Sequence, residues 1–268
     1  MMSDILPNQC TLKSDVTLNG VGLHTGKNVT LTFKPAPANT GYVFKRIDLE
    51  GEPCIVADAN YVTNTQRGTN LEKDDVTIQT SEHVLAALVR LEVDNCILEL
   101  NASEPPIMDG SSKFFVEAIE KAGIVTQDAV REEYVVTEII NYIDEETGSE
   151  ITILPSDTYQ VTTMVDFGTK VLGTQNASIK NISEFKSEIS DSRTFSFLHE
   201  IEMLLDHGLI KGGDLNNAIV YVDKQLSEKT MEKLRHAFGK DTISVKPNGI
   251  LDNLTLHHPN EAARHKLL

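Results

Sequence analysis

The sequence predicts an α+β protein of two similar domains, each a β-sheet layered against α-helices. Short strand patterns, with apolar residues at every second position, alternate with amphipathic helical patterns in residues 1–126. A polar, acidic stretch near residues 126–133 is suited to a linker, and strand and helix patterns then begin again. We therefore expect a first domain in residues 1–126 and a second in residues 131–268.

The elements of the first domain follow from apolar spacing and from residues that begin or end helices. Residues 29–33 alternate with period two and predict a strand, and residues 96–100 predict another. Ser81 is a favourable helix N-cap, and apolar side chains follow it at helical spacing. A second helix is expected over residues 114–122, where Gly123 ends it.

The second domain is expected to contain further strands and two helices. The acidic run over residues 144–148 is interpreted as a hairpin turn. The expected strands are residues 134–136, 151–154, 159–165 and 218–222, and the expected helices are residues 183–207 and 260–268.

Composition limits the classes of partner. The formal net charge of −16 argues against nucleic acid and against an anionic membrane surface, because both attract basic proteins. The sequence has no apolar run near the roughly 20 residues of a membrane span, and no signal-peptide pattern. Three cysteines without Cys-x-x-Cys spacing fit a reducing compartment, so we expect a cytoplasmic protein.

Two histidines stand in segments that suit a metal-dependent hydrolase. Glu82 and His83 are adjacent at the start of a predicted helix, and His265 lies on another predicted helix far along the chain. A hydrolytic zinc site needs three protein ligands, an open position for water and a nearby carboxylate as general base. Taken alone the pattern is unspecific, since the chain has eight histidines.

Segments spread in order along the whole chain are similar to the signatures of one family. They are GVGLHTG at 20–26, PAPANTG at 35–41, TSEHVLAAL at 80–88, PIMDGS at 106–111, SRTFSF at 192–197 and RHKLL at 264–268. In this combination the chain resembles the UDP-3-O-acyl-N-acetylglucosamine deacetylases, the zinc enzymes of lipid A synthesis. The resemblance implies an active site in the cleft between the two domains.

The resemblance also implies roles at the reacting centre. His83 and His265 would bind zinc, or iron, since imidazole accepts both. Glu82 would take a proton from the attacking water, and Thr194 would help to stabilise the oxyanion of the tetrahedral intermediate. The family's third ligand, an aspartate, would fall one residue beyond Leu268, and its catalytic histidine would follow later. We therefore expect a fragment with little or no activity.

The implied substrate is a UDP-sugar that carries a fatty acyl chain. Lys266 could meet a phosphate of the nucleotide or the developing oxyanion, and Phe195 and Phe197 could contact substrate in the cleft. The alternatives are a solvent-facing lysine and, for Phe197, a core position. His24 lies either near the metal or in an ordinary turn.

Other segments are given roles by the same resemblance. Asp109 and Gly110 are expected to form a turn and a helix cap. Residues 65–69 are expected to rim the cleft. Leu209, Ile210 and residues 218–220 could line an apolar passage for the acyl chain, or belong to an ordinary core.

Two functions of another class stay open. The chain could be an inactive fragment that binds the sugar nucleotide. It could also be a domain that tethers a fused enzyme, because some members of the family are joined to a 3-hydroxyacyl-ACP dehydratase, which would follow residue 268.

Overall fold

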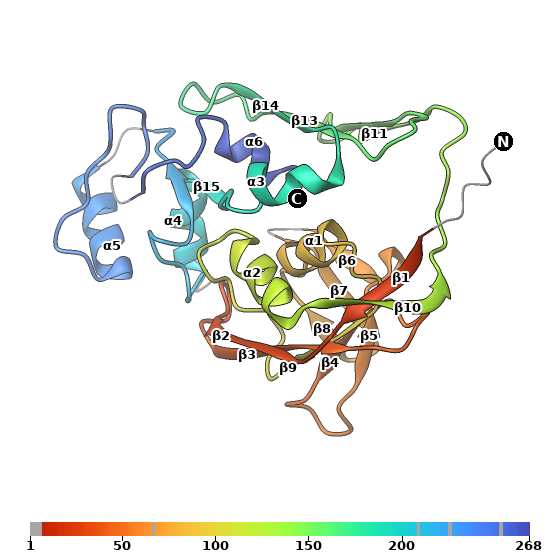
Figure 1. The fold of residues 1–268 in the computed structure, drawn as a ribbon. Helices are drawn as coiled ribbons and strands as arrows, with labels where there is room; N and C mark the ends of the chain where they lie inside the picture. The colour runs from red at the N-terminus through yellow and green to blue at the C-terminus, as the bar shows by residue number, and fades with distance from the viewer. Residues whose placement is uncertain (1–6, 66–67, 208–209, 225–226, 252–253) are drawn as a thin grey trace.

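The computed structural model has a mixed α/β fold. It describes residues 7–65, 68–207, 210–224, 227–251 and 254–268. Figure 1 shows a five-stranded sheet at the bottom, two layers of helices above it and paired strands at the top. The lower helices are α1 (Glu82–Arg90) and α2 (Lys113–Ala122), and the upper ones are α3 (Phe185–Glu188) and α6 (Glu261–His265). None of the helices in the described ranges has the length and apolarity needed to cross a membrane.

The five-stranded sheet is the framework of the first half. In spatial order its strands are β2 (Val16–Val21), β3 (Asn28–Pro35), β9 (Cys96–Leu100), β4 (Tyr42–Arg46) and β5 (Cys54–Val56). Neighbours are antiparallel except β9 and β4, which run parallel. Alternate residues point to one buried face, where Leu31, Phe33, Leu98 and Leu100 are 0% exposed. Both strands predicted for this region, 29–33 and 96–100, are confirmed.

Helices α1 and α2 bury their apolar faces in the core above this sheet. Their buried core residues include Val84, Ala87, Leu88, Phe115 and Ile119. The rings of Phe115 and Phe33 have centroids 6.3 Å apart, which joins α2 to β3. As predicted, α1 begins after Ser81 and α2 ends at Gly123. This packing fixes the direction in which the first turn of α1 points.

Residues 126–130 belong to a strand and not to a linker. β10 (Ile124–Val130) pairs antiparallel with β1 (Asn8–Leu12), so this part of the linker prediction is wrong. The strand resembles a linker in sequence because most of its side chains are exposed. A small separate sheet contains β6 (Val62–Asn64), β7 (Asn70–Lys73) and β8 (Val76–Ile78). The division into domains 1–126 and 131–268 stays a prediction.

The second half contains three strand pairs. They are β11 (Ile140–Ile143) with β12 (Glu150–Ile153), β13 (Val161–Asp166) with β14 (Thr174–Ile179), and β15 (Phe195–Phe197) with β16 (Ile219–Tyr221). Only the β15–β16 pair is parallel. The predicted turn over residues 144–148 joins β11 to β12, whereas residues 134–136 do not form the predicted strand.

The single helix predicted over residues 183–207 is wrong. The chain instead forms a 3₁₀ turn, α3, strand β15 and α4 (Leu198–Asp206). The Ser190 hydroxyl donates a hydrogen bond to the Lys186 carbonyl, and β15 pairs with β16, so these bonds replace a continuous helical ladder. Thr194 therefore lies beside a strand. The final helix is also shorter than predicted, since α6 ends at His265.

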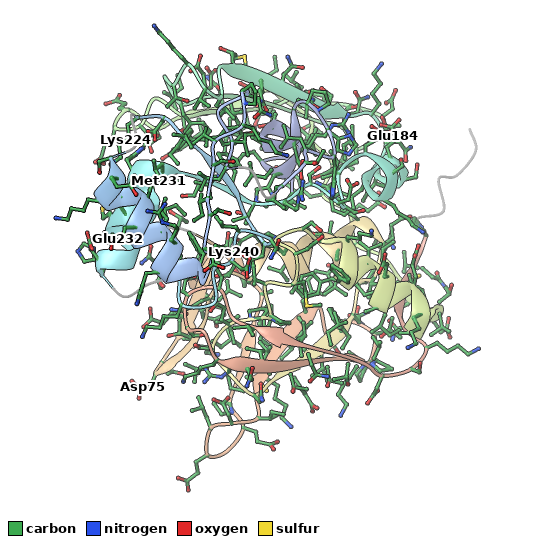
Figure 2. All side chains as sticks on the ribbon, turned by 90° about the vertical axis from the view of Figure 1, so that its left-hand side faces the viewer. Asp75, Glu184, Lys224, Met231, Glu232 and Lys240 are labelled. Atoms are coloured by element: carbon green, nitrogen blue, oxygen red, sulfur yellow. The ribbon has the colours of Figure 1, made fainter. Side chains whose placement is uncertain are left out.

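Helix α5 (Glu228–Phe238) is absent from the sequence prediction, although both of its ends carry signals. Ser227 Oγ accepts a hydrogen bond from the N–H of Thr230, and Gly239 ends the helix with a φ of 59°. Figure 2 shows α5, with Met231 and Glu232 labelled, in front of the molecule beside α4. Leu234 of α5 and Leu198 of α4 share a second, smaller core cluster.

Cys96 is expected to resist alkylation in the folded protein, whereas Cys54 reacts. Cys96 on β9 is 0% exposed, and burial raises the pKa of its thiol to about 12, so the reactive thiolate is scarce. Cys54 on β5 is exposed. Iodoacetamide labelling with mass spectrometry should modify Cys54 under native, mildly alkaline conditions and Cys96 only in denaturant. Rapid native labelling of Cys96 would contradict the buried position of β9.

Candidate functional site

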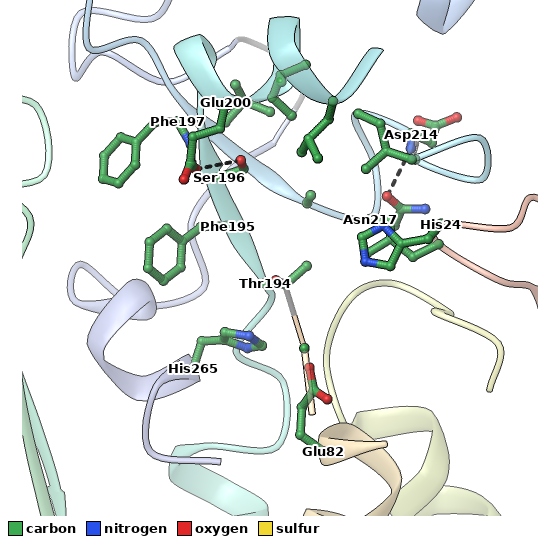
Figure 3. Close-up of a pocket in the computed structure, with 18 of the residues that line it drawn as sticks. His24, Glu82, Thr194, Phe195, Ser196, Phe197, Glu200, Asp214, Asn217 and His265 are labelled. Atoms are coloured by element: carbon green, nitrogen blue, oxygen red, sulfur yellow. Dashed lines mark hydrogen bonds between the residues drawn. The ribbon is translucent and has the colours of Figure 1, made fainter. Parts of the chain in front are cut away.

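A cavity of about 790 Å³ lies between the two halves of the chain. Figure 3 shows Glu82 and His265 reaching from different helices toward the space below Thr194. Most of the predicted site residues line this one cavity: Glu82, Thr194, Phe195, Phe197, His265 and Lys266. The structure therefore gathers residues that are separated by more than a hundred positions in the sequence.

The two predicted metal ligands, His83 and His265, lie next to each other. Their ring centroids are 5.2 Å apart, and the ring planes are inclined by 42°. His83 lies in the first turn of α1, and His265 is the last residue of α6. Nδ1 of His265 is 3.2 Å from the Ser192 carbonyl oxygen. Because a carbonyl only accepts, Nδ1 carries the hydrogen and Nε2 keeps a lone pair.

Both imidazoles are kept uncharged by their surroundings. Burial lowers the pKa of His83, and the carboxylates of Glu82 and Asp109 oppose this only in part. Desolvation of the His265 ring holds its pKa well below the ordinary value, and the neighbouring His83 acts in the same direction. A neutral imidazole has a free lone pair, which is the form that binds a metal ion.

The imidazole pair fits part of a metal site. The His83 ring has the backbone of Ser111 as one neighbour, and its Nε2 lies 3.9 Å from Glu82 Oε1, so both uncharged rings can act as ligands. Within the described ranges, no group of three or more His, Cys, Asp or Glu side chains could hold a metal ion. An ion held by His83 and His265 therefore needs at least one further ligand.

Glu82 is held at the cavity by the backbone of Thr69, directly before β7. Its Oε2 accepts a hydrogen bond of 2.8 Å from the N–H of Thr69, and its Oε1 lies 3.9 Å from Nε2 of His83. The side chain is 28% exposed, so the carboxylate remains open to water in the cavity. A carboxylate that is ordered on one oxygen and accessible on the other can accept a proton from a bound water.

Thr194 is placed by a close backbone contact between the two halves of the chain. Its N–H donates a hydrogen bond of 2.7 Å to the carbonyl of Gly110. A Cβ atom on Gly110 would lie 1.9 Å from the Asn217 carbonyl oxygen, so only glycine permits this approach. The side chain of Thr194 lines the cavity on the side of His265.

Asp109 forms the predicted turn but not the predicted helix cap. Its Oδ1 accepts hydrogen bonds from the N–H and the hydroxyl of Ser111, at 3.0 and 2.7 Å. The N-cap position of α2 is occupied by Ser112, so the cap prediction is wrong. The requirement for Gly110 comes from the close contact with Asn217, which the sequence alone does not reveal.

A buried ion pair ties the Thr194 segment to α6. Nε of Arg193 and its backbone N–H both donate to Glu261 Oε1, at 2.8 and 3.0 Å. Glu261 is 0% exposed, and its Oε2 also accepts from the N–H of His257 at 2.7 Å. Arg193 precedes Thr194, and Glu261 lies one helical turn before His265, so the pair fixes these two cavity residues relative to each other.

Phe195 and Phe197 belong to an aromatic wall, defined as Phe167, Phe195, Phe197 and Tyr221. The contacting rings of this wall have centroids between 5.4 and 6.2 Å apart. Phe197 is only 4% exposed, yet it also lines the cavity. The Nζ atom of Lys266 lies 5.8 Å from the centroid of the Phe195 ring, which is a cation–π contact.

Other predicted residues also line the cavity. Thr65, Gly68 and Thr69 do so, whereas Gln66 and Arg67 lie outside the described residues. Ile210, Ala218 and Val220 do so as well, and Leu209 lies outside the described residues. Further apolar residues there come from α4, α5 and the loop before β16: Ile201, Leu204, Leu215 and Phe238. His24 also lines the cavity, with a buried Nε2 that has no partner in the described part of the chain.

Neutral imidazoles beside an accessible carboxylate, in a cavity between two halves of a chain, are typical of a metal-dependent amidase. Residues 9–238 match the family model described as UDP-3-O-acyl N-acetylglycosamine deacetylase. The chain therefore belongs to the UDP-3-O-acyl-N-acetylglucosamine deacetylase family.

Individual relatives support the same assignment. The chain is 45% identical over 260 residues to the bifunctional enzyme LpxC/FabZ of Bacteroides thetaiotaomicron, covering 97% of this chain and 56% of that protein. It is 45% identical over 267 residues to the same-named enzyme of Chlorobaculum tepidum, covering 98% and 57%. It is 35% identical over 271 residues to the UDP-3-O-acyl-N-acetylglucosamine deacetylase of Myxococcus xanthus, covering 97% and 85%. The chain thus spans little more than half the length of the bifunctional relatives.

Replacing Glu261 is expected to destabilise the protein strongly. A Glu261→Ala substitution leaves the Arg193 guanidinium buried and unpaired, which typically costs about 3–5 kcal/mol in free energy of unfolding. The matched control is Glu120→Ala, since Glu120 pairs with Lys186 on the surface and such pairs contribute roughly 0–1 kcal/mol. Urea denaturation measures both. Equal losses in the two variants would contradict the structural role of the buried pair.

Proposed function

We propose that this protein hydrolyses the N-acetyl group of UDP-3-O-acyl-N-acetylglucosamine, releasing acetate and a free amine, as a step of lipid A biosynthesis. The observation that carries this proposal is the meeting of the buried His83 with His265 beside Glu82, at a cavity that Glu82 and His265 line. Family membership supports the substrate class. In this proposal, residues 1–126 and residues 131–268 form two domains, and each domain supplies half of the active site. The protein is proposed to act in the cytoplasm.

His83 and His265 are proposed as two ligands of a zinc ion, with iron as the other candidate. A hydrolytic zinc also needs a third protein ligand, and the leaving amine needs a proton donor. When bound, zinc would lower the pKa of a coordinated water to about 7 and polarise the acetamide carbonyl.

The residues of the cavity then have separate tasks. Glu82 takes the proton of the attacking water, with its other oxygen fixed by the N–H of Thr69. The Thr194 hydroxyl donates to the oxygen of the former carbonyl as negative charge develops there. The close contact of Gly110 with Thr194 and Asn217 holds this donor in place before substrate arrives.

The substrate is proposed to lie along the length of the cavity. Lys266 and the aromatic wall lie beside His265, where Lys266 would meet a phosphate or the oxyanion, and Phe195 and Phe197 would contact the substrate. The apolar lining residues, among them Ile201, Leu204 and Ile210, suit the fatty acyl chain, because burying its methylene groups is worth about 0.8 kcal/mol each.

A second function is favoured by one observation only. The bifunctional relatives are named LpxC/FabZ, and the chain covers 56–57% of their length. Residues 1–268 could therefore be the part of a longer protein that holds the sugar nucleotide and carries a fused dehydratase. In this alternative the domain would bind substrate but would not deacetylate it.

Glu82 is tested by replacement with glutamine. Glu82→Gln keeps the size of the side chain but cannot accept the proton, so kcat should fall by about 10²–10⁴-fold with bound metal unchanged. The assay measures acetate release by the protein made from the full reading frame of its gene. Glu117→Gln is the control, because that carboxylate is exposed on α2. Full activity of Glu82→Gln would remove Glu82 as the base.

The metal site is tested by titration with zinc. In the protein from the full reading frame, His265→Ala should weaken zinc binding by more than the roughly 10–100-fold that follows loss of a supporting residue. His207→Ala is the control, since that imidazole is exposed and bonds only to the Met203 carbonyl among the contacts described. Unchanged zinc affinity in His265→Ala would contradict the proposed ligand.

A further inference from the structure

Glu104 is a fully buried carboxylate to which the proposed chemistry gives no role. It is 0% exposed and lies in the segment between β9 and α2. A buried carboxylate is strongly unfavourable unless hydrogen-bond donors surround it. Its partners therefore indicate what the fold uses it for.

The donors to Glu104 come from two separate loops at the cavity. The backbone N–H groups of His24 and Thr25 donate to it at 3.1 Å, and the Thr25 hydroxyl donates at 3.2 Å. The Thr80 hydroxyl donates to Oε1, also at 3.1 Å, and this oxygen accepts from the N–H of His24 as well. A Cβ atom on Gly22 would lie 2.7 Å from Glu104 Oε2, so the glycine allows the loop to close around the carboxylate.

Thr80 has a strained backbone directly before α1. Its φ is 51°, in the left-handed region that β-branched residues rarely occupy. Such a conformation persists only where neighbouring contacts hold it. Two side chains do so in the structure, because Glu104 accepts from the Thr80 hydroxyl and Asn70 accepts from its N–H at 3.2 Å.

The conformation of Thr80 is transmitted to Glu82 through a short set of hydrogen bonds. The N–H and the hydroxyl of Ser81 both donate to the Thr69 carbonyl, at 3.1 and 2.8 Å. The N–H of Thr69 in turn donates to Glu82 Oε2. A change in the backbone of Thr80 would therefore move the group that holds the Glu82 carboxylate.

We propose that Glu104 is a positioning residue for Glu82. It holds Thr80 in its left-handed conformation against the loop that carries His24, and so sets where α1 begins and where the Glu82 carboxylate points. This inference rests on the proposed role of Glu82 as the base. It assigns to Glu104 no contact with substrate or metal.

Glu104→Gln is the informative substitution, because it preserves size but removes the charge and one acceptor oxygen. The N–H groups of His24 and Thr25 can only donate, so they need the remaining amide oxygen, and the Thr80 hydroxyl is then left with an NH₂ group and must turn from donor to acceptor. Thr80→Gly is the partner substitution, since glycine adopts a positive φ without help. Glu99→Gln is the control: Glu99 lies on the neighbouring strand β9 and pairs with Lys34 and Lys45.

Two measurements are made on each variant of the protein from the full reading frame. Amide hydrogen exchange should increase at least about tenfold in residues 22–26 and 80–83 of Glu104→Gln, and stay unchanged in α2. The kcat for deacetylation should fall by about 10–100-fold while KM changes by less than about threefold. In the Thr80→Gly background the additional effect of Glu104→Gln on kcat should be much smaller, since both changes act through Thr80. Glu99→Gln should leave both measurements unchanged.

If Glu104 only stabilised the fold, the results would differ from those expected above. Unchanged exchange in residues 80–83, or an equal loss of kcat in both backgrounds, would overturn the proposal even if the unfolding midpoint falls. The exchange measurement does not depend on catalysis. If the unsubstituted protein releases no acetate, the proposed function fails, and exchange in residues 80–83 still decides whether Glu104 holds this segment.

Discussion

The contact between Gly110 and the opposite half of the chain is the constraint on which the cavity depends. The Gly110 carbonyl accepts the N–H of Thr194, and its Cα approaches the Asn217 carbonyl so closely that no side chain fits. This contact fixes the distance between the part of the chain that carries α1 and the part that carries β15. His265 lies beside His83 and Glu82 because the two backbones meet there.

On each side of the cavity, a buried carboxylate holds two segments of the chain together by hydrogen bonds. Glu261 joins the Thr194 segment to the helix that ends in His265, and Glu104 joins the His24 loop to Thr80, two residues before α1. Both are 0% exposed and both accept backbone and side-chain donors. Since such groups are stable only when their donors are in place, each resists movement of the loop around it. Hydrolytic sites need this rigidity, because small displacements of a base or an oxyanion donor reduce the rate steeply.

Local sequence patterns predict a helix or strand correctly where its conformation is determined by residues close to it in the sequence. The strand over residues 29–33 follows from alternation, the end of α2 from Gly123, and α1 from its apolar spacing, although the Ser81 side chain does not cap α1 and donates to the Thr69 carbonyl instead. The prediction fails over residues 183–207, where pairing of β15 with β16 overrides a helical pattern. It also misses α5, although Ser227 and Gly239 mark the two ends of that helix.

The candidate site was accessible from the sequence only through family signatures. Those signatures name His83 and His265, and the structure places their rings 5.2 Å apart, which no spacing rule predicts for residues so distant in sequence. Glu104, Arg193 and Glu261 carry no local signal of their function, because their partners lie in other segments of the chain. The need for glycine at position 110 is likewise evident only from the structure, in which the Asn217 carbonyl packs against Gly110.

In the proposed site, one imidazole from α1 and one from α6 share a single divalent cation. X-ray absorption at the zinc edge, on the protein from the full reading frame, measures this directly. Imidazole scattering from at least two ligands is expected, with one imidazole lost in His83→Ala and one in His265→Ala. A zinc spectrum that is unchanged by either substitution would contradict it.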